Sequence, residues 1–382
     1  MTEHQPTFRP SWATIDLDAI RHNARALADL ASPAELLTVV KADAYGHGAL
    51  PVARAALDAG VSWLGVALVE EGVALRDAGI ETRILLLSEP PVDAATTVVE
   101  HRLTPTVYSM PAIEALAKAV IETDAKPLPV HLKIDTGMHR VGCAPDDALA
   151  LVDAIESRPE LELEGLWTHL AVADQPGNAY TDEQLDAFDS LITSLGEQGR
   201  RPPLVHASNS AGTLAHSRAR FDLVRCGIAL YGIPPSPEMA GTPAVDQVDL
   251  KPALSVTSHV SHVKTLTAGA RLSYGLHYEL GRDAQIATVP IGYADGVPRN
   301  LGLTGGEVLI RGHRCPIAGS VTMDQLMVDV GDLGVEPGDE VVLLGGQGEH
   351  AITANDWAER LGVIGYEVTT RLGPRLPRRY VP

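Results

Sequence analysis

The segment LLTVVKADAYGHGALPVARAALDAG, residues 36–60, joins a short apolar run to a turn and then to a helix-like stretch. Leu37 to Val40 are typical of a buried strand, and the apolar residues after Ala49 recur at helical spacing. Lys41 places an ammonium at the point where the apolar run meets the turn. A strand followed by a helix is the repeating unit of an α/β fold, so the number of repeats decides the architecture.

Seven further strand candidates follow at regular intervals, separated by helix-like runs. They are WLGVAL, RILLLS, TPTVYS, VHLKID, LEGLWTHLA, LVHAS and LVRCGIAL, the last of which ends at residue 230. Such alternation implies parallel strands joined by right-handed crossovers. Eight units within about 230 residues predict a (β/α)8 barrel of the TIM type, and an open doubly wound sheet is the competing arrangement. A dinucleotide fold is disfavoured because no GxGxxG follows the first strand.

The pattern changes after residue 230. The Pro-rich stretch at 231–247 is typical of a linker, and the segments after it are β-rich and separated by glycine turns. One helix is expected near the end, over residues 353–372. We therefore assign residues 11–245 to the barrel, and residues 1–10 and 246–382 to a mostly β C-terminal domain.

Composition narrows the class of protein. The 382 residues carry a formal net charge of −19, which argues against an extended nucleic-acid surface. The three cysteines are far apart and form no CxxC pair, so we expect no metal site. The N-terminal residues lack the features of a secretory signal, and no apolar stretch approaches the roughly 20 residues that span a bilayer. We expect a cytoplasmic protein without a membrane or nucleic-acid partner.

Chemistry in such a barrel sits at the C-terminal ends of the strands, and reactive side chains stand at several of these ends. They are Lys41, Lys133, Asp135, Arg140, His169, Asn209, Ser210 and Arg225, together with the backbone of Gly227 and Ile228. The last two loops commonly hold phosphate in such barrels, and here they offer a hydroxyl and backbone N–H groups.

Each candidate has a structural alternative. Lys41 could extend its ammonium to solvent, His169 could be a hydrogen-bonded core histidine, and Asp135 could belong only to a turn. Arg225 could pair with Asp222. The coincidence of these groups at successive strand ends favours a functional site.

An ordered set of motifs identifies the chain as resembling the alanine racemases, a family of fold-type III pyridoxal-phosphate enzymes. VVKADAYGHGA resembles their cofactor-lysine motif, and the resemblance covers nearly the whole chain. The other motifs, in family order, are WATIDLDAIRHN before it and, after it, KIDTGMHRVG, GLWTHLAVAD, HASNSAG, LVRCGIALYG, LSYGLHY, PIGYADG, VTMDQLMVDVG and GYEVTTRLGPRLPRRY.

The resemblance implies a role for each matching residue. Lys41 forms the aldimine with pyridoxal 5'-phosphate and is the base for D-alanine, and Tyr274 is the opposite base, for L-alanine. The remaining cofactor-binding residues are Tyr45, His169, Asn209, Ser210, Arg225, Gly227, Ile228 and Tyr366, with Arg225 facing the pyridine nitrogen. The substrate-binding residues are Arg140, Met323, Tyr293 and Asp324. Carbamylation of Lys133 occurs in some relatives.

The resemblance also implies a homodimer with composite sites, to which the partner contributes Tyr274 and Met323, and a supply of D-alanine for peptidoglycan. One departure from the family pattern is Ser320, where many relatives carry arginine. Three alternatives stay open at this point: a racemase of serine or another small amino acid, a non-catalytic pyridoxal-phosphate carrier on the same barrel, and a barrel decarboxylase of the same cofactor class. The motif LSYGLHY after the linker argues against the carrier, which would lack a tyrosine base there.

Overall fold

The computed structural model describes residues 8–382, and their contacts form two compact units. The barrel unit contains residues 20–44 and 49–251. The β unit contains the described residues up to Ala19, residues 45–48 and residues 252–382. Residues 1–7 of the expected C-terminal domain lie outside the described residues.

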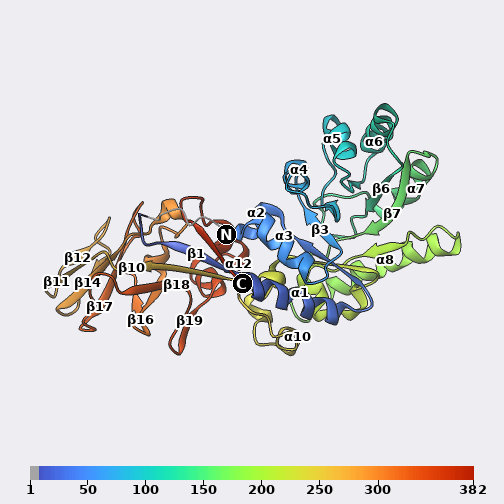
Figure 1. The fold of residues 1–382 in the computed structure, drawn as a ribbon. Helices are drawn as coiled ribbons and strands as arrows, with labels where there is room; N and C mark the ends of the chain where they lie inside the picture. The colour runs from blue at the N-terminus through green and yellow to red at the C-terminus, as the bar shows by residue number, and fades with distance from the viewer. Residues whose placement is uncertain (1–7) are drawn as a thin grey trace. The chain divides into compact units, whose positions relative to one another are not determined.

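Within the described residues, the barrel unit holds eight parallel strands (Figure 1). A parallel bridge between Leu85 and Thr104 connects its two four-stranded sheets on one side. On the other side, the Arg225 N–H donates to the Ser208 carbonyl oxygen at 3.1 Å. The predicted (β/α)8 barrel is therefore confirmed. Its strands are β2 (Glu35–Val39), β3 (Trp63–Val66), β4 (Arg83–Leu86), β5 (Thr106–Val107), β6 (Leu128–Lys133), β7 (Leu161–Trp167), β8 (Leu204–His206) and β9 (Leu223–Cys226).

Helices alternate with these strands as the apolar spacing predicted. They are α1 (Leu17–Ala31), α3 (Ala49–Asp58), α4 (Val69–Asp77), α5 (Ala95–Glu100), α6 (Met110–Thr123), α7 (Ala148–Glu156), α8 (Tyr180–Glu197), α9 (Ser210–Ala215) and α10 (Pro243–Asp246). The expected linker at 231–247 is not extended: Met239 and Val245 are buried, and the Ser236 hydroxyl donates to the Asp174 carbonyl at 2.9 Å. The segment packs as part of the barrel unit.

The β unit is mostly strand, as predicted (Figure 1). Its largest sheet has the order β16-β15-β18-β10-β1-β20, with β19 paired to β18, and a second sheet has the order β11-β14-β17. Their bounds are β1 (Trp12–Asp16), β10 (Leu254–His259), β11 (His262–Leu266), β14 (Ala284–Val289), β15 (Glu307–Ile310), β16 (His313–Pro316), β17 (Leu326–Gly331), β18 (Glu340–Gln347), β19 (His350–Ile352) and β20 (Arg378–Val381), with the short pair β12 (Arg271–Leu272) and β13 (Tyr278–Glu279) beside them.

The contact grouping and the expected domain boundaries differ at the N-terminus. The expected barrel domain begins at residue 11, whereas β1 pairs antiparallel with β10 and parallel with β20. These backbone hydrogen bonds place residues up to Ala19 with the β unit.

The single helix expected over residues 353–372 is wrong, because two helices occupy this stretch. α11 (Ala354–Leu361) ends at Gly362, which has a φ of +66° and so closes the helix in the left-handed region. α12 (Gly365–Thr370) follows after a short break and carries Tyr366.

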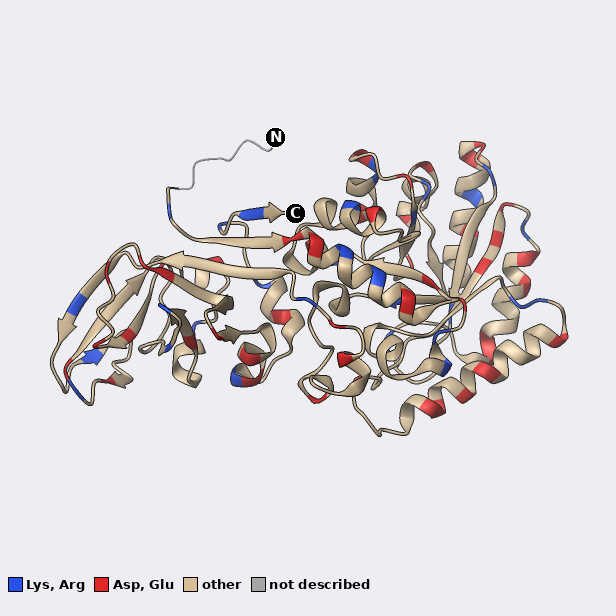
Figure 2. Ribbon diagram, turned by 60° about the horizontal axis from the view of Figure 1, so that its bottom comes forward, with Lys and Arg blue, Asp and Glu red and all other residues tan. Residues whose placement is uncertain are grey.

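Charged residues are spread over both units. Figure 2 shows acidic positions recurring along the helices. In α8, for example, Asp182 and Glu183 lie in the first turn. Within residues 8–382, every helix is too short or too polar to cross a membrane.

Candidate active site

The turn after β2 positions Lys41. β2 ends at Val39, one residue before the expected Val40, and Lys41 begins the short helix α2 (Lys41–Gly46). Residues 42–45 have φ values between +51° and +54°, so this helix is left-handed. A left-handed conformation costs roughly 1–2 kcal/mol for each non-glycine residue. Such strain persists only where contacts hold it, and it is typical of functional sites.

Side-chain carboxylates hold this turn in the barrel unit. Glu71 accepts the Ala42 N–H at 2.6 Å, and Asp43 accepts the Ala49 N–H at 2.8 Å. In the β unit, a Cβ atom added to Gly46 would lie 2.3 Å from the Thr369 carbonyl oxygen. Glycine is therefore required at 46.

Four cationic side chains come together at the strand ends of the barrel unit. Burial lowers the pKa of the Lys41 ammonium, and the nearby Arg140 guanidinium lowers it further. Burial, Arg140 and Arg225 lower the pKa of Lys133 to about 7. Burial likewise lowers the pKa of Arg225 to about 9. Mutually repelling cations of this kind suit an anionic ligand.

Arg225, on β9, is buried and held from several sides. Its Nη1 donates to His206 Nδ1 at 2.8 Å, and its Nη2 donates to the carbonyl oxygens of Thr168 and Ala207, each at 2.9 Å. The guanidinium carbon lies 4.5 Å from the centroid of the Trp167 ring. The alternative pairing of Arg225 with Asp222 is wrong, because the Asp222 carboxylate pairs with Arg201 at 2.6 Å.

His169 contacts the same guanidinium. Its Nδ1 lies 3.3 Å from Arg225 Nη2. Since arginine has donors only, Nδ1 must accept and the ring proton of the neutral imidazole sits on Nε2. Burial, and then the charges of Arg225 and Arg140, hold the pKa of His169 well below its usual value. His169 is therefore a neutral donor.

The loops after β8 and β9 meet at the Ser210 hydroxyl. Its oxygen accepts the N–H of Gly227 at 3.0 Å and that of Ala229 at 3.3 Å. Both lone pairs are thus occupied, and the hydroxyl proton is left to donate to an anion. The Gly227 N–H, expected to bind phosphate itself, is committed to Ser210 here, while Ile228 begins the 3₁₀ turn Ile228–Tyr231.

Asn209 has a structural role in the same loop. Its side-chain oxygen accepts the Gly212 N–H at 2.9 Å and so caps α9. Sequence reasoning grouped Asn209 with cofactor-binding residues, and the cap explains why Asn stands directly before Ser210. The cap fixes the first turn of α9, which carries the Ser210 hydroxyl.

The predicted tyrosines belong to the β unit. The rings of Tyr45 and Tyr366 lie 5.9 Å apart, centroid to centroid. Tyr274 is 70% exposed and stands between two residues with positive φ, Ser273 and Gly275. The Ser320 hydroxyl donates to the Tyr274 carbonyl at 3.2 Å. The departure at Ser320 therefore supports the loop that carries Tyr274, a role that sequence reasoning missed.

The predicted substrate-side residues of the β unit lie on two interlocked loops. The Tyr293 N–H donates to the Thr322 carbonyl at 2.9 Å, and the Ala294 N–H donates to the Met323 carbonyl at 3.0 Å. A Cβ atom at Gly292 would lie 2.4 Å from that same Met323 oxygen. The side chains of Tyr293 and Met323 are both exposed.

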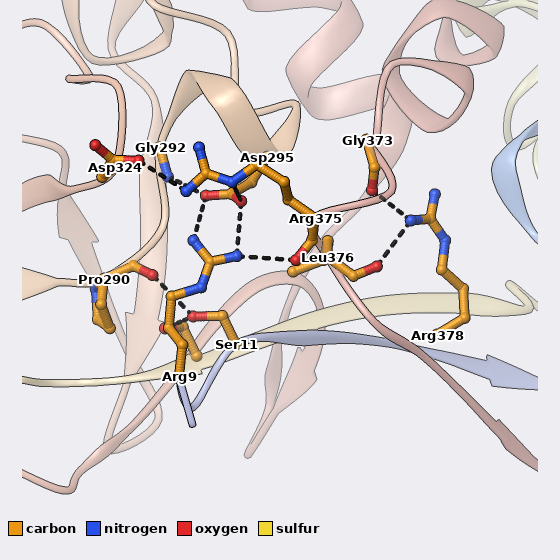
Figure 3. A network of polar contacts seen from close by, with 11 residues as sticks. Arg9, Ser11, Pro290, Gly292, Asp295, Asp324, Gly373, Arg375, Leu376 and Arg378 are labelled. Atoms are coloured by element: carbon orange, nitrogen blue, oxygen red, sulfur yellow. Dashed lines mark hydrogen bonds and ion pairs between the residues drawn. The ribbon is translucent and has the colours of Figure 1, made fainter. Parts of the chain in front are cut away.

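An arginine from the N-terminal arm braces these loops (Figure 3). Arg9 donates to both carboxylate oxygens of Asp295 at 2.7 Å, and Asp295 has no exposed surface. Arg375 bridges this carboxylate, at 3.6 Å, to Asp324, at 2.7 Å. The Asp324 carboxylate, expected at the substrate, is thus already paired with Arg375. Sequence reasoning missed this network because its partners are far apart in the chain.

Comparison with known proteins gives the family of this chain. Family models for the N-terminal and C-terminal domains of alanine racemase match residues 15–235 and 253–380. The chain is 46% identical over 374 residues to the alanine racemase of Symbiobacterium thermophilum, covering 98% of this chain and 97% of the relative.

Solved structures give the same result. The alanine racemase of a D-cycloserine-producing Streptomyces lavendulae superimposes with a TM-score of 0.91 at 41% identity, covering 99% of this chain and 98% of that one. The Bacillus anthracis alanine racemase with bound L-Ala-P gives 0.90 at 38% identity, covering 99% and 96%. The chain therefore belongs to the alanine racemase family.

Proposed function

We propose that this protein interconverts L-alanine and D-alanine with pyridoxal 5'-phosphate, in a two-base reaction that supplies D-alanine for peptidoglycan. The observation that carries the proposal is the group of four cationic side chains at the barrel strand ends, in a chain of this family. Such a group can bind both the phosphate of a cofactor and the carboxylate of an amino acid.

The residues present fit that cofactor. Lys41 offers an amine whose lowered pKa favours the neutral, nucleophilic form. The Ser210 hydroxyl has its proton available for a phosphate oxygen. Tyr45 and Tyr366, whose rings lie near each other in the β unit, would donate to the same phosphate. Arg225 would donate to the pyridine nitrogen. When bound, the cofactor supplies an aldehyde that condenses with amines and a ring that withdraws electrons from the substrate Cα.

Two bases then exchange the Cα proton from opposite faces. Lys41 Nζ takes and returns the proton on the D-alanine side, and the hydroxyl of the partner subunit's Tyr274 does so on the L-alanine side. A single base would have to cross the plane of the substrate, which two fixed bases avoid. The high exposure of Tyr274 in one chain supports a role in a partner's site, and hence a homodimer.

Arg140, the Met323 backbone, Tyr293 and Asp324 would line the substrate side. Arg140 provides a guanidinium for the substrate carboxylate. Its charge also acts on the two lysines of the barrel unit, Lys41 and Lys133. A carbamate on Lys133 would change repulsion of Arg140 into attraction, because the neutral amine adds carbon dioxide, forms an N–C bond and releases a proton.

A chiral assay of the purified protein tests the proposal. L-alanine, L-serine and other L-amino acids are incubated with pyridoxal phosphate, and the D-enantiomer is measured by chiral chromatography. We expect alanine to be the preferred substrate, and Lys41→Ala to lose both the visible absorption of bound cofactor and the activity. Unchanged activity in Lys41→Ala would overturn the mechanism, and a preference for serine would reassign the substrate.

A further inference from the structure

A series of hydrogen-bonded side chains runs from the buried Arg225 through the barrel core to Glu164, which is partly exposed. Arg225 Nη1 lies 2.8 Å from His206 Nδ1, and His206 Nε2 lies 2.9 Å from His131 Nδ1. His131 Nε2 lies 3.3 Å from Glu164 Oε2. The four residues come from β9, β8, β6 and β7, and both histidines are fully buried. The site is thus hydrogen-bonded to a carboxylate with which Arg225 has no contact.

The direction of every bond in this chain is fixed by arginine chemistry. A guanidinium has donors and no acceptor, so His206 Nδ1 must accept, and its proton sits on Nε2. His206 Nε2 then donates to His131 Nδ1, which leaves the His131 proton on Nε2, facing Glu164. Burial lowers the pKa of both histidines, which keeps both rings neutral. With the proton of each histidine on Nε2, every hydrogen bond from Arg225 to Glu164 has one donor and one acceptor.

Arg225 needs such a connection because no carboxylate of residues 8–382 pairs with its guanidinium. In the described part of the chain, its hydrogen-bond partners are two histidine nitrogens and two carbonyl oxygens. Burying a cation without a paired anion is costly. Glu164 is the carboxylate that this chain reaches, and its other oxygen lies 3.3 Å from Arg83 Nη1.

We propose that Glu164 is a positioning residue for Arg225, acting through His131 and His206. A carboxylate that accepts from an imidazole N–H makes the other ring nitrogen a stronger acceptor, as in carboxylate–histidine pairs behind metal sites. Two such steps strengthen the acceptor that faces Arg225. The guanidinium is thereby held charged and in one orientation. That this orientation faces the ring nitrogen of the cofactor rests on the proposed function.

Nuclear magnetic resonance of ¹⁵N-histidine in the full-length holoenzyme tests the chain directly. We expect His131 and His206 to be neutral Nε2–H tautomers in the wild type. Glu164→Gln keeps an acceptor but removes the charge, so the His206 resonances should shift although His206 does not contact Glu164. An Nδ1–H tautomer at either histidine, or an unshifted His206 in Glu164→Gln, would overturn the proposal.

Two matched variants separate this role from plain stabilisation. Glu162→Gln removes one carboxylate from an exposed position of the same strand, and Arg83→Gln removes the ion-pair partner of Glu164. Glu164→Gln should lower alanine racemisation roughly 10-fold and raise pyruvate formed per racemisation event, whereas both controls stay near wild type. If Arg83→Gln matches Glu164→Gln in both readouts, Glu164 is only an ion-pair partner. An absence of racemisation in the wild type would overturn the proposed function. The histidine tautomers would still test the hydrogen-bonded series from Arg225 to Glu164.

Discussion

The Nζ atom of Lys133 lies 4.4 Å from the centroid of the Trp167 ring, and the guanidinium carbon of Arg225 lies 4.5 Å from the same centroid. Two cations therefore share one indole, which attracts each through its ring electrons. The indole lessens their mutual repulsion but provides no negative charge. A modification that made Lys133 negative would therefore give Arg225 a neighbouring anion in place of a neighbouring cation.

We predict that Lys133 is carbamylated when bicarbonate is present. Its pKa of about 7 leaves a large neutral fraction at physiological pH, and the neutral amine is the form that adds carbon dioxide. Native mass spectrometry at neutral pH should show one added carbon dioxide that is lost on acidification and absent in Lys133→Ala. Lys118, exposed on α6, provides the control, since Lys118→Ala should retain the added mass. An unchanged mass in bicarbonate would contradict this prediction.

The same lysine gives a pH dependence of stability. Because burial lowers the pKa of Lys133 from 10.5 to about 7, the unfolded chain binds more protons between these values. The free energy of unfolding should therefore rise with pH between about 7 and about 10.5. Below about 7, Lys133 lowers the free energy of unfolding by the largest amount, because folding then buries a charged ammonium or forces it to lose its proton. Denaturant titrations in carbonate-free buffer should show Lys133→Met more stable than wild type at pH about 7, with the difference shrinking as pH rises. A constant difference would contradict the assignment.

Much of this site could be predicted because strand ends are visible in the sequence. Lys41 stands where an apolar run stops, and Arg225 stands within the strand candidate LVRCGIAL, next to the last residue of β9. A barrel brings the ends of such strands together. The turn after Lys41 was predicted, but its left-handed conformation at 42–45 was not, since Ala-Asp-Ala-Tyr contains no glycine to favour a positive φ and Glu71 holds the turn through the Ala42 N–H. Gly362 was a visible signal that should have divided the last helix. The pairing of Arg9 with Asp295 is fixed by packing over 286 positions, and no local pattern encodes it.

Arg225 is predicted to control which reaction follows loss of the Cα proton. Its guanidinium donates a hydrogen bond without giving up its proton, so the cofactor ring would withdraw electrons weakly and the Cα would regain its proton quickly. Arg225→Glu should lower alanine racemisation by about 100-fold, as loss of a preorganised donor does, and raise pyruvate from transamination. Arg225→Lys keeps a cation and should form less pyruvate. No rise in pyruvate for Arg225→Glu would contradict this explanation of selectivity.

Tyr274→Phe should separate the two faces of the reaction. Without the phenol, exchange of the Cα proton from L-alanine should fall by about 10²–10⁴-fold, the usual contribution of a positioned acid or base. Exchange from D-alanine, where Lys41 acts, should fall much less. Deuterium uptake from heavy water, measured for each enantiomer, gives the comparison. Tyr278→Phe is the matched control, because its hydroxyl donates to Asp329 at 3.0 Å in the same unit. Equal rates for both enantiomers in Tyr274→Phe would contradict the two-base assignment.

Arg9→Ala should destabilise the β unit and loosen the loops that carry Tyr293 and Met323. The variant leaves the buried Asp295 carboxylate with Arg375 at 3.6 Å as its remaining arginine. Removing one partner of a buried ion pair costs about 3 kcal/mol in the free energy of unfolding. Denaturant titration measures this loss, and Arg271→Ala provides the control because its pair with Glu279 is exposed and contributes about 0–1 kcal/mol.

The double variant Arg9→Ala/Asp295→Asn distinguishes a lost ion pair from a merely shortened side chain. Removing the carboxylate charge together with Arg9 should restore part of the stability, because the uncompensated buried charge is gone. The alanine KM should be raised in Arg9→Ala and equally raised in the double variant, since in both the N-terminal arm no longer braces the two loops. The opposite result is a double variant that loses more free energy of unfolding than the two single variants lose together. It would show that Asp295 acts chiefly within its own loop, through the hydrogen bond that it accepts from the Gly292 N–H at 3.0 Å.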